Sequence, residues 1–243
     1  MNKTAQESMN FMEKLSSFLM KDTHSFNCHI VIAPPVIHLP HCVQFSKEIN
    51  LAAQNLASED FGAYTGEISA SMLSEYVKYT IIGHSERRRY FQETAIILNK
   101  KITMALKYNI RPIFCIGEKE QDRERGHYFN VIEDQLNETI MLLSNEHLSD
   151  CIIAYEPVWA IGTGKTPSLG QIEEIHAYIR KMLVSKIGKY NASKTPILYG
   201  GSCSVKNASS ILSQNNVDGL LVGGASLDFI HFKQIIECSN TSF

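Results

Sequence analysis

Short apolar runs alternate with amphipathic stretches along almost the whole of this 243-residue chain. The apolar runs, bounded by Gly, Pro or polar residues, predict buried strands. They lie at residues 29–33, 49–54, 79–83, 112–116, 151–155, 196–199 and 219–222. Apolar residues at helical spacing predict helices at 5–20, 71–78, 94–108, 130–143, 169–187, 206–214 and 229–237, with a helical patch at 40–47.

This alternation predicts one α/β domain, residues 1–243, with a parallel sheet, because the composition shows no linker and no low-complexity segment. A helix that Asn2 or Thr4 could cap precedes the first strand. The seven strands are one short of the eight that a βα barrel requires. We therefore expect a barrel whose first strand is missing, with two sheet edges unpaired.

Charge and cysteine content narrow the possible partners. The net charge of −2 gives no reason to expect nucleic acid or an anionic membrane as partner. The six cysteines are scattered and form no CxxC pair, which favours reduced thiols and a cytoplasmic location over disulfides or zinc. No apolar run approaches the roughly 20 residues of a membrane span, and the polar N-terminus does not resemble a signal peptide.

The run at 151–155 ends in a carboxylate, Glu156, which Pro157 follows at once. A mostly small, apolar loop comes next, at 158–164. This pattern is typical of an acid or base beneath a lid that excludes water. A carboxylate at the start of a helix, followed by an ordinary βα loop, would give the same pattern, so the local sequence leaves both interpretations open.

Other polar or glycine-rich segments also follow predicted strands. His84 follows the strand at 79–83, Gly200-Gly201-Ser202 follows the strand at 196–199, and Gly223-Gly224 follows the last strand. Ligands bind at the carboxyl ends of parallel strands, and such glycines can direct backbone N–H groups at a phosphate. Either glycine pair alone could be a tight turn, and His84 alone could be structural. Together they favour a phosphate site with an acid or electrophile beside it.

The chain resembles the triosephosphate isomerase family from residue 1 to its C-terminus. The segments that carry the resemblance are residues 53–55, 62–69, 82–88, 115–118, 154–164, 199–202 and 223–224. The resemblance implies a TIM (β/α)8 barrel that interconverts dihydroxyacetone phosphate and glyceraldehyde 3-phosphate through an enediolate. It implies no metal and no organic cofactor. It also implies a homodimer, formed through the loop around Thr65.

The resemblance assigns roles to individual residues. Glu156 would be the base, His84 the neutral electrophile, and residues 157–165 the lid. Glu86 would match a carboxylate beside the catalytic Lys of the family. The positions that match the phosphate-binding residues are Gly162, Ser202, Gly223 and Gly224.

The chain departs from the family at its start. The family opens with a strand ending in Gly-Asn-Trp-Lys-Met-Asn, which places that Asn and Lys before Met1 and leaves Glu86 without its partner. Lys3 is no obvious substitute. Loss of one preorganised group that stabilises the transition state, such as the Lys of the family, can lower the rate by about 10²–10³. Three hypotheses stay open: a start codon placed too late, a truncated form with little activity, or a non-catalytic phosphate-binding or interaction protein on an incomplete barrel.

Overall fold

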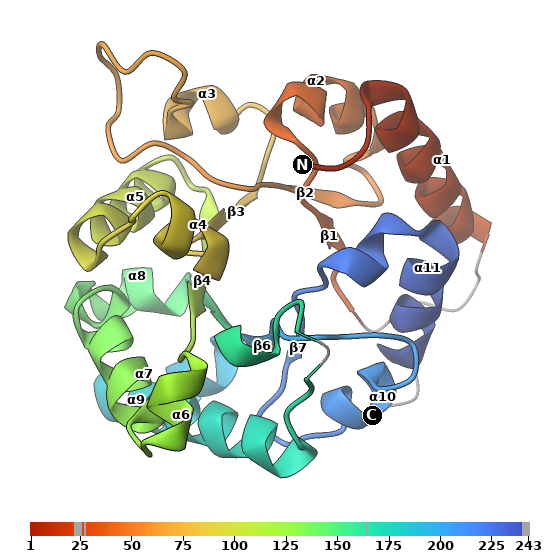
Figure 1. Ribbon diagram of the computed structural model, residues 1–243. Coiled ribbons are helices and arrows are strands. Elements are labelled where there is room, and N and C mark those ends of the chain that lie inside the picture. The colour runs from red at the N-terminus through yellow and green to blue at the C-terminus, as the bar shows by residue number, and fades with distance from the viewer. Residues whose placement is uncertain (22–25, 27, 164, 240–243) are drawn as a thin grey trace.

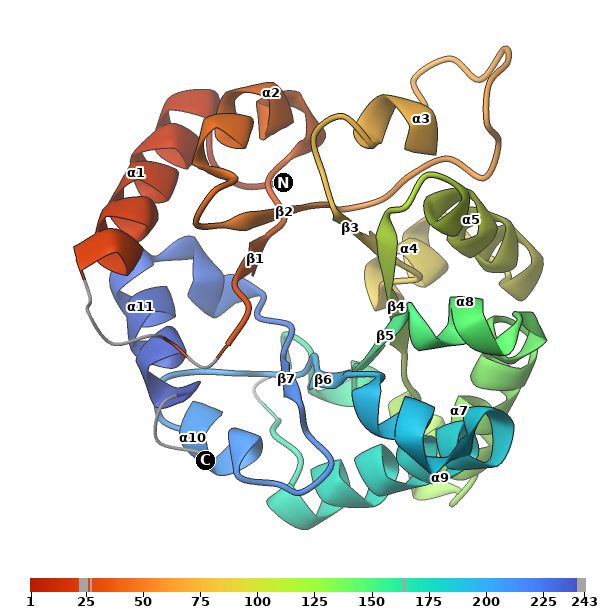
Figure 2. The ribbon, with the colours of Figure 1, turned by 180° about the vertical axis from the view of Figure 1, so that it is seen from behind.

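Seven parallel strands form one curled sheet, with helices around its outside, in the computed structural model (Figures 1 and 2), which describes residues 1–21, 26, 28–163 and 165–239. The strand order follows the chain. The strands are β1 (Val31–Ile32), β2 (Asn50–Ala53), β3 (Tyr79–Ile82), β4 (Arg111–Ile116), β5 (Ile152–Tyr155), β6 (Ile197–Tyr199) and β7 (Gly219–Leu220). The described part of the chain thus confirms the predicted parallel sheet and its seven strands, with β1 and β7 at the edges.

Most of the helices lie in the connections between these strands, while the first helix precedes β1 and the last follows β7. The α-helices are α1 (Ala5–Lys21), α2 (Leu39–Cys42), α3 (Ala70–Leu73), α4 (Ser85–Tyr90), α5 (Ala95–Lys107), α6 (Glu120–Glu124), α7 (Tyr128–Asn137), α8 (Asn145–Ser149), α9 (Leu169–Lys194), α10 (Ala208–Leu212) and α11 (Phe229–Cys238). Short 3-10 helices are η1 (Val36–His38), η2 (Val43–Phe45), η3 (Ile140–Leu142), η4 (Val158–Ala160) and η5 (Gly224–Leu227).

Several element boundaries differ from the prediction. The edge strands β1 and β7 are shorter than their apolar runs, because each is paired on one side only. Helix α3 ends at Leu73 rather than at residue 78, and α9 runs on to Lys194 through a change of direction at Gly188 (φ 77°). The short helices α4, α6 and α8 were not predicted, because one or two turns show no clear periodicity.

Both faces of the central strands are buried. On one face, Ile113 and Cys115 of β4 pack with Ile152 and Ala154 of β5 in a small cluster. The alternate residues of the same strands, such as Phe114, join the large cluster that includes the helices. This two-residue period places the small cluster inside the curled sheet and the large one beneath the helices. Burial on both faces explains why these strands read as continuous apolar runs.

The start of the chain packs against its end. The Phe11 ring of α1 lies 6.3 Å from that of Phe229 and 6.1 Å from that of Phe232 on α11. Thr4 caps α1, because its Oγ1 accepts the Glu7 N–H at 3.3 Å while its own N–H donates to the Glu7 carboxylate at 2.7 Å. The six cysteines all lie among the described residues, and no disulfide joins them. Within the described residues, every helix is too short or too polar to cross a membrane.

Candidate active site

Two strand ends bring the predicted acid–base pair together. Gly83 follows β3 with φ +74°, a backbone conformation that favours glycine, and the chain then enters α4 with His84 as its N-cap. Glu156 follows β5, and its N–H donates to the Ile116 carbonyl of β4 at 2.7 Å. Its side chain is only 2% exposed. Because neighbouring parallel strands end at the same rim, residues far apart in sequence meet here.

The carboxylate of Glu156 is held at both oxygens. The His84 Nε2 atom lies 3.0 Å from Oε1, and the backbone N–H of Ser85 donates to Oε2 at 3.0 Å. Both contacts come from the residues that directly follow Gly83. The turn after β3 therefore positions an imidazole and a backbone donor on one buried carboxylate.

The contacts of His84 define which ring nitrogen carries the proton. The Glu86 N–H donates to Nδ1 at 3.3 Å, so Nδ1 is the acceptor and Nε2 donates to Glu156. Burial disfavours the charged ring, but the hydrogen bond and charge of Glu156, with a smaller effect of Glu86, outweigh it and raise the pKa of His84 above its usual value. The neutral ring with its proton on Nε2 satisfies both hydrogen bonds, so the contacts of His84 correspond to this tautomer.

Glu86 lies at the edge of this arrangement. Its Oε2 atom is 3.8 Å from the Nδ1 atom of His84, and its side chain is 70% exposed. The carboxylate thus contributes charge near the imidazole while remaining in water.

Two glycines make room for Glu156. A Cβ atom at Gly117 would overlap the carbonyl oxygen of Glu156, so only glycine allows β4 and β5 to approach so closely at their ends. A Cβ atom at Gly200 would lie 2.9 Å from the Glu156 Cγ atom. The glycines after β4 and β6 therefore flank the carboxylate from either side.

A buried carboxylate that we had not predicted as a site residue anchors the start of the predicted lid. Glu118 is fully buried, and its Oε1 accepts the Trp159 Nε1–H at 2.7 Å and the Tyr155 hydroxyl at 3.0 Å. The Arg123 guanidinium lies 3.6 Å away. Burial raises the pKa of Glu118 in spite of these donors. A carboxylate just after a predicted strand was the available signal, since Gly117-Glu118 follows the run at 112–116.

The predicted phosphate-binding residues lie at the ends of β5, β6 and β7. Gly162 is in the lid and is exposed with φ +68°, while Gly164 of the predicted lid lies outside the described residues. Ser202, Gly223 and Gly224 are exposed, and a Cβ atom at either glycine would meet open space. The topology places these residues on the same rim as Glu156, with accessible backbone.

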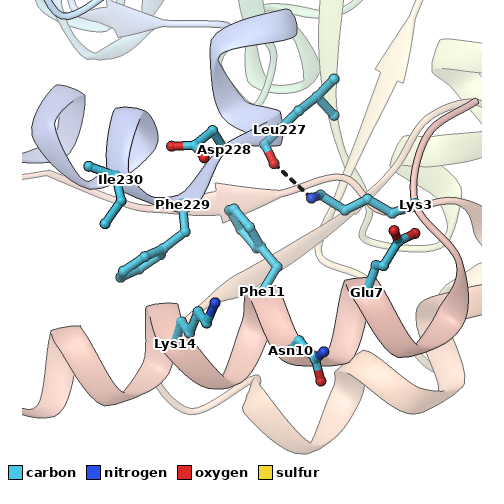
Figure 3. A pocket seen from close by; sticks show the side chains of 9 residues that line it. All are labelled: Lys3, Glu7, Asn10, Phe11, Lys14, Leu227, Asp228, Phe229 and Ile230. Carbon is cyan, nitrogen blue, oxygen red and sulfur yellow. Dashed lines mark hydrogen bonds between the residues drawn. The ribbon is translucent and has the colours of Figure 1, made fainter.

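Lys3 is engaged elsewhere. It lies just before α1 with φ 66°, and its Nζ donates to the Leu227 carbonyl of η5 at 2.7 Å (Figure 3). The side chain lines an open groove of about 570 Å³ between α1 and the start of α11. Its ammonium group thus caps η5, consistent with the expectation that Lys3 is no substitute for a catalytic lysine.

Comparisons with known proteins agree with this geometry. The sequence profile of the family described as "Triosephosphate isomerase" matches residues 1–239. A triosephosphate isomerase of Porphyromonas gingivalis is 46% identical over 240 residues, which cover 98% of this chain and 95% of that protein. A triosephosphate isomerase of Bacteroides fragilis is 45% identical over 243 residues, 99% of this chain and 96% of that protein.

The chain belongs to the triosephosphate isomerase family. The curled parallel sheet is consistent with the TIM barrel fold of this family, which confirms the predicted fold class. Among the described residues, no group of three or more His, Cys, Asp or Glu side chains could hold a metal ion.

Proposed function

We propose that this protein interconverts dihydroxyacetone phosphate and glyceraldehyde 3-phosphate, with Glu156 as the base and His84 as the electrophile. The observation that carries the proposal is the 3.0 Å contact between these two side chains at the ends of β3 and β5. Membership of the triosephosphate isomerase family supports the reaction itself.

The chemistry follows from the atoms in contact. A Glu156 carboxylate oxygen removes a proton from the carbon beside the carbonyl, and the electrons move to the carbonyl oxygen to form an enediolate. The Nε2–H of His84, which donates to Glu156 in this structure, donates to that oxygen when substrate is bound. His84 transfers this Nε2 proton to that oxygen and accepts the proton of the neighbouring hydroxyl, while Glu156 returns its proton to the former carbonyl carbon, so that carbonyl and hydroxyl exchange places. The burial of the carboxylate keeps water from competing for the proton.

We propose that Gly162, Ser202, Gly223 and Gly224 hold the substrate phosphate. Their exposure and their place at the ends of neighbouring strands support this assignment. Backbone N–H groups suit a dianion, because each donates a hydrogen bond without bringing a side chain. Glu86 adds a carboxylate beside His84 and acts on that ring rather than on the substrate.

The test of the site is the Glu156→Gln substitution, which keeps the size of the side chain and removes the base. We expect kcat to fall by about 10²–10⁴ while phosphate still binds. Glu146→Gln, at an exposed position in α8, is the matched control and should retain full activity. Unchanged turnover in Glu156→Gln would refute the assignment, and binding of phosphate without turnover by the unsubstituted protein would refute the proposed reaction.

We also propose that two copies associate through the loop around Thr65. The loop at residues 57–69 projects from the body of the molecule (Figure 1) and exposes Phe61 at 89% and Tyr64 at 51%. Nearby, α4 and its end expose Tyr90 and Phe91. Large apolar side chains exposed together favour a protein interface. Six cysteines without a disulfide between them suit a reducing compartment, and we propose a cytoplasmic location.

A further inference from the structure

The turn that carries His84 is held by an arginine further along the same helix, Arg88 of α4. The Arg88 Nε–H donates to the Gly83 carbonyl at 2.8 Å, and the Arg88 backbone N–H donates to the His84 carbonyl at 3.1 Å. These two carbonyls belong to the peptide groups on either side of the His84 Cα atom. Arg88 therefore fixes both peptide groups from which the direction of the imidazole is set.

The guanidinium of Arg88 also joins this turn to the neighbouring strand, because its Nη2–H donates to the Cys115 carbonyl of β4 at 2.8 Å. The next carbonyl of β4, that of Ile116, accepts the Glu156 N–H on the β5 side. Successive carbonyls of a strand point to opposite neighbours, so the Cys115 carbonyl faces β3. The paired part of β3 ends one residue before Gly83. Arg88 thus supplies a donor to a carbonyl that faces the point where β3 leaves the sheet.

The shape of the guanidinium suits these contacts. Two N–H groups of one planar group each meet a carbonyl at 2.8 Å, and the group lies over the Phe114 ring, 5.5 Å from its centroid. Among the described residues Arg88 forms no ion pair, so the hydrogen bonds of its side chain go to the backbone at two strand ends. A lysine ammonium is a single point donor on a flexible stem, and it does not reproduce this planar fork.

We propose that Arg88 is a positioning residue, which holds His84 against the Glu156 carboxylate by joining the end of β3 to β4. This inference rests on the proposed function, since it takes His84 as the electrophile. The Ser85 N–H, which donates to Glu156 at 3.0 Å, is placed by the same turn. Arg88 acts on the reaction through the backbone of His84 and does not contact the substrate.

Three variants separate this role from general effects of charge. Arg88→Met removes the charge and both donors, while Arg88→Lys keeps the charge and removes the planar fork. Arg88→Lys also keeps the proposal testable if Arg88→Met does not fold. Arg89→Met is the matched control, because Arg89 lies on the same helix, is exposed, and has its guanidinium 5.1 Å from the centroid of the Tyr90 ring.

The first measurement does not depend on turnover. The NMR chemical shifts of the His84 ring nitrogens, at a pH where the ring is neutral, report which nitrogen carries the proton. In the unsubstituted protein and in Arg89→Met we expect the Nε2–H tautomer, because Nε2 contacts Glu156 and Nδ1 accepts the Glu86 N–H. In both Arg88 variants we expect a mixture of the two tautomers. An unchanged single tautomer in both would overturn the proposal.

The second measurement is steady-state kinetics. Misplacing a catalytic group by about 1 Å can lower the rate about 10²-fold. We therefore expect kcat to fall about 10- to 10²-fold in both Arg88 variants and to stay unchanged in Arg89→Met. The affinity for inorganic phosphate, measured by calorimetry, should not change. In a His84→Gln background, Arg88→Met should lower kcat by less than about twofold, because the side chain that Arg88 positions is already absent.

The outcomes distinguish the two proposals. A fall in kcat as large in the His84→Gln background as in the unsubstituted one would overturn the role of Arg88, and so would an equal fall in phosphate affinity, which would indicate a general loss of structure. Full activity of His84→Gln would refute the proposed function. A change of His84 tautomer in the Arg88 variants of a protein without isomerase turnover would refute the proposed function and leave the positioning by Arg88 standing.

Discussion

Stability at acid pH should depend on one buried histidine behind the active site. His176 of α9 is fully buried, and its ring packs edge-on against Tyr155, the residue before Glu156, with centroids 5.8 Å apart. Its Nδ1–H donates to the Asn216 carbonyl at 3.1 Å, while its Nε2 finds no hydrogen-bond partner among the described residues. Protonation would place an unpaired N–H and a charge in the core, and this burial lowers the pKa of His176 to about 4.

The sign of the pH dependence follows from this lowered pKa. Below about pH 6.5 the unfolded chain binds a proton at His176 that the folded chain refuses until about pH 4. The stabilisation is complete above pH 6.5 and is lost as the pH falls toward 4. The gap between 6.5 and about 4 corresponds to roughly 3 kcal/mol in the free energy of unfolding, most of which is lost by pH 4.5.

Urea unfolding at pH 7 and pH 4.5, at one protein concentration, measures this loss. His176→Asn is the matched variant, because the Asn amide can donate to the Asn216 carbonyl in place of Nδ1 but does not titrate. Between the two pH values the free energy of unfolding of the variant should fall by roughly 2 to 3 kcal/mol less than that of the unsubstituted protein. Equal losses in both proteins would show that His176 is not the group responsible.

Two further predictions concern the strand ends and the proposed interface. Gly117→Ala should lower kcat/KM by about 10² or more, because the new Cβ overlaps the Glu156 carbonyl and displaces the base. Steady-state kinetics would check this. Gly170→Ala is the neutral control, because its Cβ meets only the Ser168 hydroxyl, at 4.0 Å. Phe91→Glu should raise the dissociation constant of the proposed dimer tenfold or more, because it places a charge in the proposed apolar interface. Analytical sedimentation would measure this constant. If the unsubstituted protein is a monomer, the proposed dimer is wrong.

The arrangement of the strands was predictable because their signal is local. In β4 the Phe114 side chain is buried beneath the helices and the adjacent Ile113 side chain is buried inside the curled sheet, so the strand reads as an apolar run. The polar residues that end these runs then indicate one rim, because parallel strands all end on the same side. His84 and Glu156 could be placed on that rim from the sequence for this reason.

The contacts on the rim depend on the tertiary structure. The curvature of the sheet decides that Nε2 of His84 meets the Glu156 carboxylate, and the turn after Gly83 decides that the Ser85 N–H joins it. The burial of Glu118 under Trp159, and the pairing of Lys165 with Glu120, likewise link segments that no local pattern connects.

The sequence by itself therefore determined which elements form and which side chains reach the rim, since burial leaves a local periodic pattern. Only the tertiary structure decided which atoms touch there, because distances of about 3 Å between separate strands depend on how the whole sheet curls.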